Sequence, residues 1–258
     1  MSVIPPLAAR LKSQLAYALS QHPRLYRSAQ GLYRRFTLHR TLPLQVEILQ
    51  GLRGLREVYF VQVGSNDGGA QNDPLHQLIV RNPDWRGIFI EPVPFLFERL
   101  RANYAGNTRF AFENVAIAAS AGLAPFYYVS EQAKQALGER LPYWYDQLGS
   151  FDRNHIVKHL EGLLEPFIVE VQLPCLPITA VLERNGASHV DLLHIDTEGY
   201  DYEVLKQFDF PRYKPRVVLY EHKHLGSEHL LAARELLVKQ GYSLHARTAD
   251  TLALRLSR

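Results

Sequence analysis

Cysteine is almost absent from this chain, which has a single one, Cys175, among its 258 residues. One cysteine excludes an intramolecular disulfide and any zinc site that is built from several cysteines. The chain also lacks an uninterrupted apolar run of about 18 residues, the length that a membrane-spanning helix needs. Its first residues do not show the charged-then-apolar layout of a secretory signal. These absences lead us to expect a cytoplasmic protein without a membrane span.

The composition is that of an ordinary globular protein. Hydrophobic residues make up 47% and charged residues 21% of the sequence, close to the average for such proteins. We find no internal repeat and no low-complexity tract. A chain of this length can bury a sizeable core without disulfides. We therefore expect one large domain, or one domain with an appendage.

Positive charge is concentrated near the N-terminus. Residues 1–56 carry a net charge of +8, whereas residues 57–258 carry a net charge of −5. Leucine spacing and basic, aromatic clusters predict three helices in the first part, over 5–21, 23–40 and 43–53. We interpret residues 1–57 as a basic helical N-terminal extension.

The role of this extension is open between several alternatives. Its helices pack on the main domain, contact a second copy of the chain in a homo-oligomer, or lie peripherally on an anionic membrane or partner surface. Basic amphipathic helices are typical of such surfaces. We do not expect a nucleic-acid partner, because the larger part of the chain is acidic.

From residue 58 onward, predicted strands and helices alternate. This pattern predicts an α/β domain over 58–258 with a Rossmann-like, doubly wound, mostly parallel sheet. The expected strands are 58–63, 87–91, 109–116, 125–129, 190–195, 216–220, 242–246 and 251–256, and the expected helices are 74–81, 94–104, 178–185, 201–207 and 227–240. The last two strands form a predicted hairpin, so we expect an antiparallel C-terminal strand and at least one antiparallel edge strand.

Residues 131–168 depart from this alternation. They are rich in Tyr, Trp, His and Leu and show no strand pattern. Long insertions between regular elements are more often functional than idle. We therefore expect this insertion to form a lid or a wall of the substrate site.

The first predicted strand ends in the glycine-rich stretch GSNDGG, residues 64–69. A doubly wound sheet binds its ligand at this place, and Gly64 and Gly68 permit a sharp turn and close approach of the backbone. The stretch matches neither a Walker loop nor G-x-G-x-x-G. Asp67 would repel a pyrophosphate but suits a cationic, amino-bearing ligand. The loop therefore favours S-adenosylmethionine over NAD.

The next two strands end in further polar side chains. Glu91 follows the second strand, 24 residues after Asp67, and an acid at this position can hold both ribose hydroxyls. It serves NAD and S-adenosylmethionine equally. Asn114 follows the third strand, where it reaches the adenine edge or caps a turn.

Two later strands deliver acids and histidines. The stretch VDLLHIDTEGYDYEVLKQF, 190–208, places Asp196 and Glu198 at a strand tip, and RVVLYEHKH, 216–224, does the same for Glu221, His222 and His224. Asp196, Glu221 and His222 could bind Mg²⁺ or Mn²⁺, which prefer oxygen ligands. Alternatively, His222 is a general base, or the three form a polar network that caps the sheet.

The remaining histidines allow a different interpretation. We expect His194, inside its strand, to be packed or hydrogen-bonded. His155 and His159 share one face if their part of the insertion is helical, which makes them candidates for the substrate side.

Taken in order, VGSNDG, IEPVP, ENVAIA, HIDTEGYDYEVLKQF and VVLYEH resemble the FkbM family of S-adenosylmethionine-dependent methyltransferases over residues 58–245. The resemblance implies methyl transfer, mostly to hydroxyls of sugars or polyketide-type products. It implies a cofactor site made of Gly64, Ser65, Asn66, Asp67, Gly68, Glu91, Pro92, Asn114, Val115 and Asp196. Related sugar O-methyltransferases hold a divalent ion where Asp196, Glu221 and His222 stand. His222 departs from the Asp or Asn that is commoner there.

Together these observations predict an O-methyltransferase that acts on a hydroxyl of a sugar, a glycan or a glycosylated natural product. We expect Asp196, Glu221 and His222 to be catalytic, with His222 taking the acceptor proton. Candidate acceptor contacts are Gln71, Asp73, Ser150, His155, Glu198 and His224, with 71–73 and 150–155 closing over the acceptor. A nicotinamide-dependent oxidoreductase and a non-catalytic scaffold that binds a membrane or partner are the alternatives.

Overall fold

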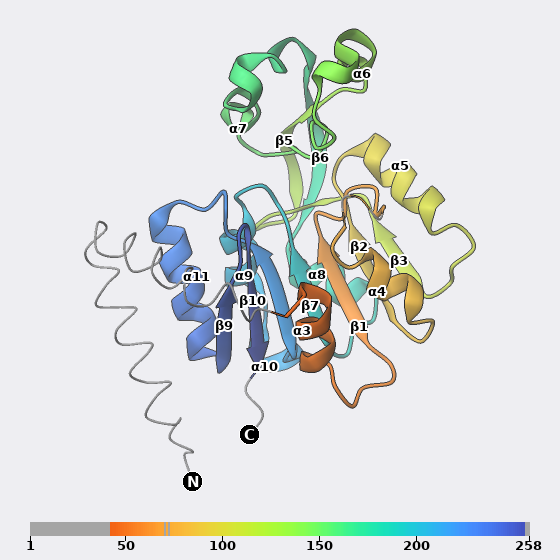
Figure 1. Ribbon diagram of the computed structural model, residues 1–258, viewed down its shortest axis with the longest axis vertical. Helices are drawn as coiled ribbons and strands as arrows, with labels where there is room; N and C mark the ends of the chain where they lie inside the picture. The colour runs from red at the N-terminus through yellow and green to blue at the C-terminus, as the bar shows by residue number, and fades with distance from the viewer. Residues whose placement is uncertain (1–41, 70, 72, 256–258) are drawn as a thin grey trace. The chain divides into compact units, whose positions relative to one another are not determined.

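The computed structural model describes residues 42–69, 71 and 73–255 (Figure 1). The helices expected over 5–21 and 23–40 lie outside the described residues. The third expected helix is confirmed as α3 (Leu44–Gly51). One compact unit spans Ile48–Leu256. Among the described helices, none combines the length and apolar character needed to cross a bilayer.

A seven-stranded sheet forms the centre of this unit. Its strands are β1 (Tyr59–Val63), β2 (Arg86–Ile90), β3 (Phe110–Glu113), β7 (Leu192–Ile195), β8 (Val217–Glu221), β9 (Tyr242–Ala246) and β10 (Asp250–Arg255). They lie in the order β3-β2-β1-β7-β8-β10-β9. The pairings β1 to β2, β2 to β3, β1 to β7 and β7 to β8 are parallel. The predicted mostly parallel sheet with an antiparallel C-terminal strand is confirmed.

The C-terminal strand β10 lies in the interior of the sheet, and the hairpin places β9 at the edge. β10 lies between β8 and β9 and is antiparallel to both, so β9 and not β10 forms the edge. The burial of the two strands explains this order. Thr251, Leu252 and Ala253 of β10 are all buried, whereas most of β9 is partly or fully exposed. A strand with consecutive buried residues suits the interior of a sheet that is covered on both faces.

Helices cover both faces of the sheet. They are α4 (His76–Arg81), α5 (Pro94–Asn103), α8 (Ile178–Arg184), α9 (Asp201–Gln207), α10 (Phe210–Tyr213) and α11 (Ser227–Lys239). On one face, Val61 of β1 belongs to the core cluster that includes Val181 of α8 and Val204 of α9. On the other, Phe60 packs its ring 5.0 Å from that of Phe89. This alternation follows from the two-residue period of a strand.

A second, three-stranded sheet adjoins the first. It has the order β4-β6-β5, formed by β4 (Ala116–Ile117), β5 (Gly122–Val129) and β6 (Ile168–Leu176). β4 belongs to the strand expected over 109–116, which divides between the two sheets. We did not predict β6. Its alternation is interrupted by Pro174, which pairs with Leu123 inside the strand, and proline normally argues against a strand interior.

The insertion between β5 and β6 is built from short helices. These are α6 (Gln132–Leu137), α7 (Arg153–Val157) and the 3-10 turns η1 (Gly138–Arg140), η2 (His159–Gly162) and η3 (Glu165–Phe167). Its own small core includes Ala133, Leu148, Ile156 and Leu164. In Figure 1, β5 and β6 lead away from the large sheet and carry α6 and α7 at their far end.

Candidate active site

A pocket lies at the carboxyl ends of β1, β2 and β7. It contains about 810 Å³ of space, part of which is open to solvent, within the range of small-molecule sites. The chain order of the sheet reverses between β1 and β7, and ligands of open α/β sheets bind at such a point. Its lining residues are Gln62, Val63, Gly64, Ser65, Asn66, Ile90, Glu91, Pro92, Val93, Leu96, Val115, Ala116, Ile117, Phe126, Gln147, Gly149, Ser150, Phe151, His194, Asp196, Thr197, Glu198 and Tyr200.

The glycine-rich loop after β1 holds a conformation that its glycines make possible. Gly64 and Gly68 have φ values of +78° and +64°, in the left-handed region that favours glycine. Asp67 Oδ1 accepts a hydrogen bond from the Gly69 amide at 2.8 Å, and the Gly68 carbonyl accepts one from Tyr104 at 3.1 Å. Gly64 lines the pocket, whereas Asp67 and Gly68 stabilise the loop from outside the lining.

Glu91 is the buried carboxylate of the pocket. Its two oxygens accept backbone hydrogen bonds from Asn66 at 2.7 Å and from Val93 at 2.9 Å. Burial nevertheless raises the pKa of Glu91 to about 7, against the effect of these two hydrogen bonds. A carboxylate has about four lone-pair positions, so acceptor capacity remains for a ligand's hydroxyls.

Two other predicted cofactor residues support this end of the pocket. Ser65 Oγ accepts a hydrogen bond from the Ile90 amide at 3.1 Å and donates one to the Gln62 carbonyl at 3.1 Å. Asn114 Nδ2 donates to the Glu91 carbonyl at 2.8 Å, and Asn114 itself does not line the pocket. These side chains join the strand tips, while Pro92 and Val115 contribute to the wall.

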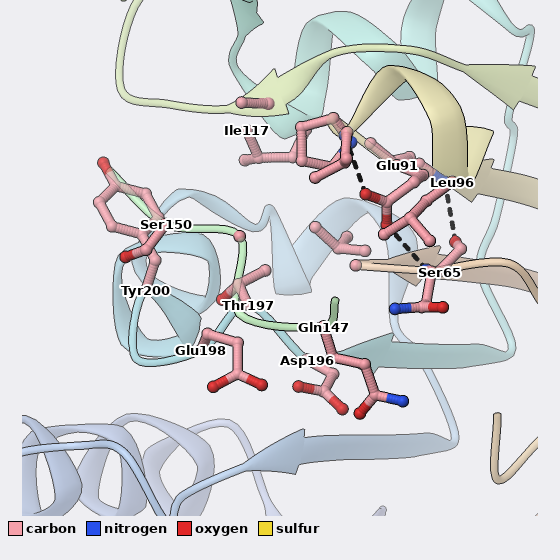
Figure 2. A pocket seen from close by; sticks show the side chains of 18 of the residues that line it. Ser65, Glu91, Leu96, Ile117, Gln147, Ser150, Asp196, Thr197, Glu198 and Tyr200 are labelled. Carbon is pink, nitrogen blue, oxygen red and sulfur yellow. Dashed lines mark hydrogen bonds between the residues drawn. The ribbon is translucent and has the colours of Figure 1, made fainter. Parts of the chain in front are cut away.

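Four acids, Asp196, Glu198, Asp201 and Glu221, form an acidic cluster at the opposite end. Figure 2 shows the Asp196 and Glu198 carboxylates and the Gln147 amide pointing the same way, apart from Glu91. Burial and the neighbouring carboxylates raise the pKa of both Asp196 and Glu221. Such a cluster favours a cationic ligand, because a positive charge offsets the cost of ionising these acids together.

Asp201 links the segments that carry the other acids of the cluster. The side chain is fully buried. Its Oδ2 accepts a hydrogen bond from Thr197 Oγ1 at 3.0 Å, and its Oδ1 accepts one from the Glu221 amide at 3.2 Å. Burial raises the pKa of Asp201 to about 7. This side chain thus connects the tips of β7 and β8.

Of the predicted metal ligands, Asp196 and Glu221 lie near each other in the acidic cluster, but His222 does not join them. His222 follows Glu221 at the end of β8 and therefore projects to the opposite side. Its Nδ1 forms a hydrogen bond with Thr251 Oγ1 at 3.0 Å, and it does not line the pocket. The residues present thus do not fit the predicted Mg²⁺ or Mn²⁺ site, and His222 lies away from the position expected of a base.

A different group of side chains converges beside the acidic cluster. Glu198 Oε2 lies 3.0 Å from His155 Nε2 and 3.3 Å from His224 Nε2. His224 Nε2 is also 3.7 Å from Glu221 Oε1. Burial lowers the pKa of His224 to about 4. Of the predicted acceptor contacts, His155, Glu198 and His224 are thus brought together, and only Glu198 of these three lines the pocket.

The other predicted acceptor contacts lie in three different settings. Ser150 lines the pocket, and Gln71 is exposed outside it. Asp73 is buried, and its Oδ1 accepts hydrogen bonds from Gln62 Nε2 at 3.0 Å and from the Leu75 amide at 2.7 Å. Asp73 therefore stabilises the start of the segment before α4, away from the pocket lining.

Sequence reasoning missed Gln147 and expected His194 to be packed or hydrogen-bonded within its strand. Both line the pocket. The Nε2 atom of Gln147 and the Nδ1 atom of His194 are buried and have no hydrogen-bond partner in the part of the chain that the structure describes. Burial lowers the pKa of His194 to about 4. Gln147 lies in the insertion, where no periodic sequence pattern indicates a pocket residue. His194 could have been found from its position, because it lies one residue before the end of its strand.

Comparison with solved structures gives distant similarities. Similar structures include a methyltransferase from Geobacter sulfurreducens (13% identity, 99% of this chain and 100% of that chain, TM-score 0.41). Another is a putative caffeoyl-CoA O-methyltransferase from Staphylococcus aureus (10% identity, 95% of this chain and 99% of that chain, TM-score 0.42). A third is a precorrin-6y C5,15-methyltransferase from Geobacter metallireducens GS-15 (12% identity, 83% of this chain and 88% of that chain, TM-score 0.39). No curated protein matches the chain significantly.

The family comparison is decisive. The methyltransferase FkbM domain matches residues 62–244, which include the glycine-rich loop, Glu91 and the acidic cluster. This match decides against the nicotinamide-dependent oxidoreductase that the sequence had left open. The chain belongs to the FkbM family of S-adenosylmethionine-dependent methyltransferases.

Proposed function

We propose that the protein transfers the methyl group of S-adenosylmethionine to a hydroxyl of a sugar, a glycan or a glycosylated natural product. The observation that carries this proposal is the position of Glu198. Its carboxylate lines the pocket and contacts two imidazoles, those of His155 and His224. A hydroxyl must lose its proton during methylation, and Glu198 offers a proton acceptor at the pocket wall.

In the proposed complex, the cofactor lies between the two acidic ends of the pocket. Glu91 takes the ribose hydroxyls, and the backbone around Gly64 approaches the methionine part. The acidic cluster, with Asp196 at the pocket, offsets the positive charges of the ammonium and sulfonium groups. The charges and the burial described above support each placement.

Methyl transfer is then a direct displacement. The acceptor oxygen lies about 3 Å from the methyl carbon, in line with the carbon–sulfur bond. The new carbon–oxygen bond forms as the carbon–sulfur bond breaks, and Glu198 takes the hydroxyl proton. S-adenosylhomocysteine leaves with a neutral sulfur. The sulfonium is already a good leaving group, so the protein mainly has to position the acceptor and remove its proton.

The composition of the pocket wall supports a sugar as acceptor. Phe151 and Tyr200 line the pocket with ring centroids 5.0 Å apart. Beside them lie the polar side chains of Ser150, Glu198 and Gln147. Sugars present apolar C–H faces together with hydroxyls, so a wall that alternates aromatic and hydrogen-bonding groups suits them.

The first test is binding followed by turnover. Calorimetric titration with S-adenosylhomocysteine should give a dissociation constant of about 10 µM or below, an ordinary value for a specific small ligand. Incubation with S-adenosylmethionine and a panel of nucleotide sugars, oligosaccharides and glycosylated polyketides should then yield a product heavier by one methyl group. Fragmentation that places the methyl on nitrogen or carbon would overturn the O-methyl assignment. Cofactor binding without turnover of any acceptor class would favour the scaffold interpretation.

The role of Glu198 is tested by Glu198→Gln, which keeps the shape and removes the base. We expect kcat to fall about 100-fold or more, the usual contribution of general base catalysis, while S-adenosylhomocysteine affinity changes little. The matched control is Glu228→Gln, because Glu228 is exposed on α11. Equal kcat values for Glu198→Gln and the unsubstituted enzyme would exclude Glu198 as the base.

A further inference from the structure

Three histidine rings meet beside Glu198, and the proposed methyl transfer leaves one of them, His159, without a role. His155 lies in α7, His159 in η2 and His224 in the segment between β8 and α11. One ring nitrogen from each lies within 4.8 Å of the others. Two segments far apart in the sequence, the insertion and the end of β8, therefore contribute to one imidazole cluster.

The spacing of the rings matches that of histidines around a tetrahedral ion. The centroid distances are 4.9 Å between His155 and His159, 5.0 Å between His155 and His224, and 5.7 Å between His159 and His224. Zinc–nitrogen bonds of about 2.0–2.1 Å in a tetrahedral site place neighbouring ring centroids about 5 Å apart. The cluster thus needs only small side-chain adjustments to surround a metal.

The hydrogen bonding of His159 prepares it as a ligand. Its Nδ1 donates to the His155 carbonyl at 2.8 Å. This bond leaves Nε2 without the proton in the neutral ring, so Nε2 has a lone pair available. Metal-binding histidines are typically oriented in this way, by a hydrogen bond from the other ring nitrogen to a backbone carbonyl or a carboxylate.

Carboxylates next to the rings supply compensating charge. Glu198 Oε2 is 3.0 Å from His155 Nε2, and Glu221 Oε1 is 3.7 Å from His224 Nε2. Glu221 is 8% exposed, and its Oε2 is buried without a hydrogen-bond partner among the described residues. An unsatisfied carboxylate oxygen at this position is costly in isolation and favours a nearby cation.

We propose that His155, His159 and His224 bind one divalent transition-metal ion, with Zn²⁺ as the preferred species, and that Glu198 is its neighbouring carboxylate. Imidazole ligands suit Zn²⁺ and similar ions, whereas Mg²⁺ prefers oxygen. The site differs from the Asp196, Glu221 and His222 set that the sequence suggested. A bound ion would connect the insertion to the end of β8, next to the part of the pocket where we place the acceptor. The inference does not depend on the identity of the acceptor.

The test measures metal binding directly, on full-length protein freed of any histidine tag and treated with a chelator. Titration with ZnCl₂ should show one ion per chain with a dissociation constant of about 1 µM or below, as expected for several protein ligands. Co²⁺ in its place should give the intense visible absorption of a four-coordinate ion. MgCl₂ should produce neither signal.

Variants then locate the ion. His159→Ala and His159→Gln should each weaken Zn²⁺ binding at least about 100-fold, because each removes a direct ligand. His229→Ala is the matched control, since His229 is an exposed histidine on α11 and should leave the affinity unchanged. Circular dichroism and S-adenosylhomocysteine binding confirm that each variant is folded. Absence of saturable Zn²⁺ binding, or equal loss in the His229 variant, would overturn the proposal even where cofactor binding is intact.

Discussion

The backbone of Gly64 lies directly against the carbonyl of Asp196. A Cβ atom on residue 64 would be 1.7 Å from the Asp196 oxygen, far inside any allowed contact. Gly64 also has a φ of +78°, which costs other residues about 1–2 kcal/mol. This contact joins the tips of β1 and β7, and both residues line the pocket.

Gly64→Ala should therefore separate the two tips. We expect S-adenosylhomocysteine affinity to fall at least about 100-fold, since misplacement of about 1 Å is enough for such an effect. Gly226→Ala is the control, because a Cβ there meets nothing within 4 Å and the φ of Gly226 is −62°. Calorimetric titration of both variants compares them, and wild-type affinity in Gly64→Ala would contradict the described contact.

Gln147 presents a buried amide nitrogen to the pocket without a partner among the described residues. Such an atom costs about 1–3 kcal/mol in the ligand-free protein. Gln147→Leu should therefore raise the melting temperature of the ligand-free protein by a few degrees and weaken cofactor or acceptor binding. Differential scanning fluorimetry with and without S-adenosylhomocysteine measures the first effect, and turnover measures the second. Gln132→Leu, at an exposed position of α6, should do neither.

The acidic cluster predicts a pH-dependent preference for the charged cofactor. Burial and mutual repulsion raise the pKa values of Asp196 and Glu221, so both are more protonated in the ligand-free protein than ordinary carboxyls. A sulfonium favours their ionised forms, and its binding therefore releases protons. We expect S-adenosylmethionine affinity to rise with pH above the ordinary carboxyl range, toward the raised pKa of Glu221 at about 10. S-adenosylhomocysteine has the same amino acid part without the sulfonium charge, so its affinity should rise less, and identical pH profiles would contradict this account.

Asp73 should make the protein less stable as the pH rises. Its pKa is raised from the ordinary value of 3.8 to about 6, chiefly by burial. Between these values the folded state binds more protons than the unfolded state, so the free energy of unfolding falls with increasing pH. This loss of stability is complete above the pKa of Asp73 in the folded state and absent below its pKa in the unfolded state.

Asp73→Asn should remove this pH-dependent loss of stability without disturbing the packing. Asp73 Oδ1 accepts both hydrogen bonds, and Oδ2 is buried without a partner among the described residues. An asparagine keeps the accepting oxygen. The variant should therefore be more stable than the wild type by up to about 3 kcal/mol above pH 6, at about 1.4 kcal/mol per pKa unit. Urea unfolding at several pH values should show this gain disappearing below about pH 4.

Local signals in the sequence brought Gly64 and Glu91 to the pocket. A glycine-rich turn after a strand, and an acid at the next strand tip, depend on residues close together in the chain. Gly64 and Glu91 both line the pocket as expected. The residues expected to be catalytic depend on the side to which each one projects at a strand end. His222 was expected beside Asp196 and Glu221, but it contacts Thr251 and lies outside the pocket lining. We did not predict β6, because Pro174 interrupts its alternating pattern. The strand is stabilised by pairing with its two neighbours, β4 and β5.

The sequence by itself determined the α/β class, the mostly parallel sheet and the family, because strand periodicity, turn glycines and strand-tip acids are encoded over short stretches. Only the tertiary structure decided that β10 lies inside the sheet, that Gln147 reaches the pocket, and that His155 and His159 meet His224. These outcomes depend on contacts between residues far apart in the chain. Such contacts arise from the packing of whole elements, and no local pattern specifies them.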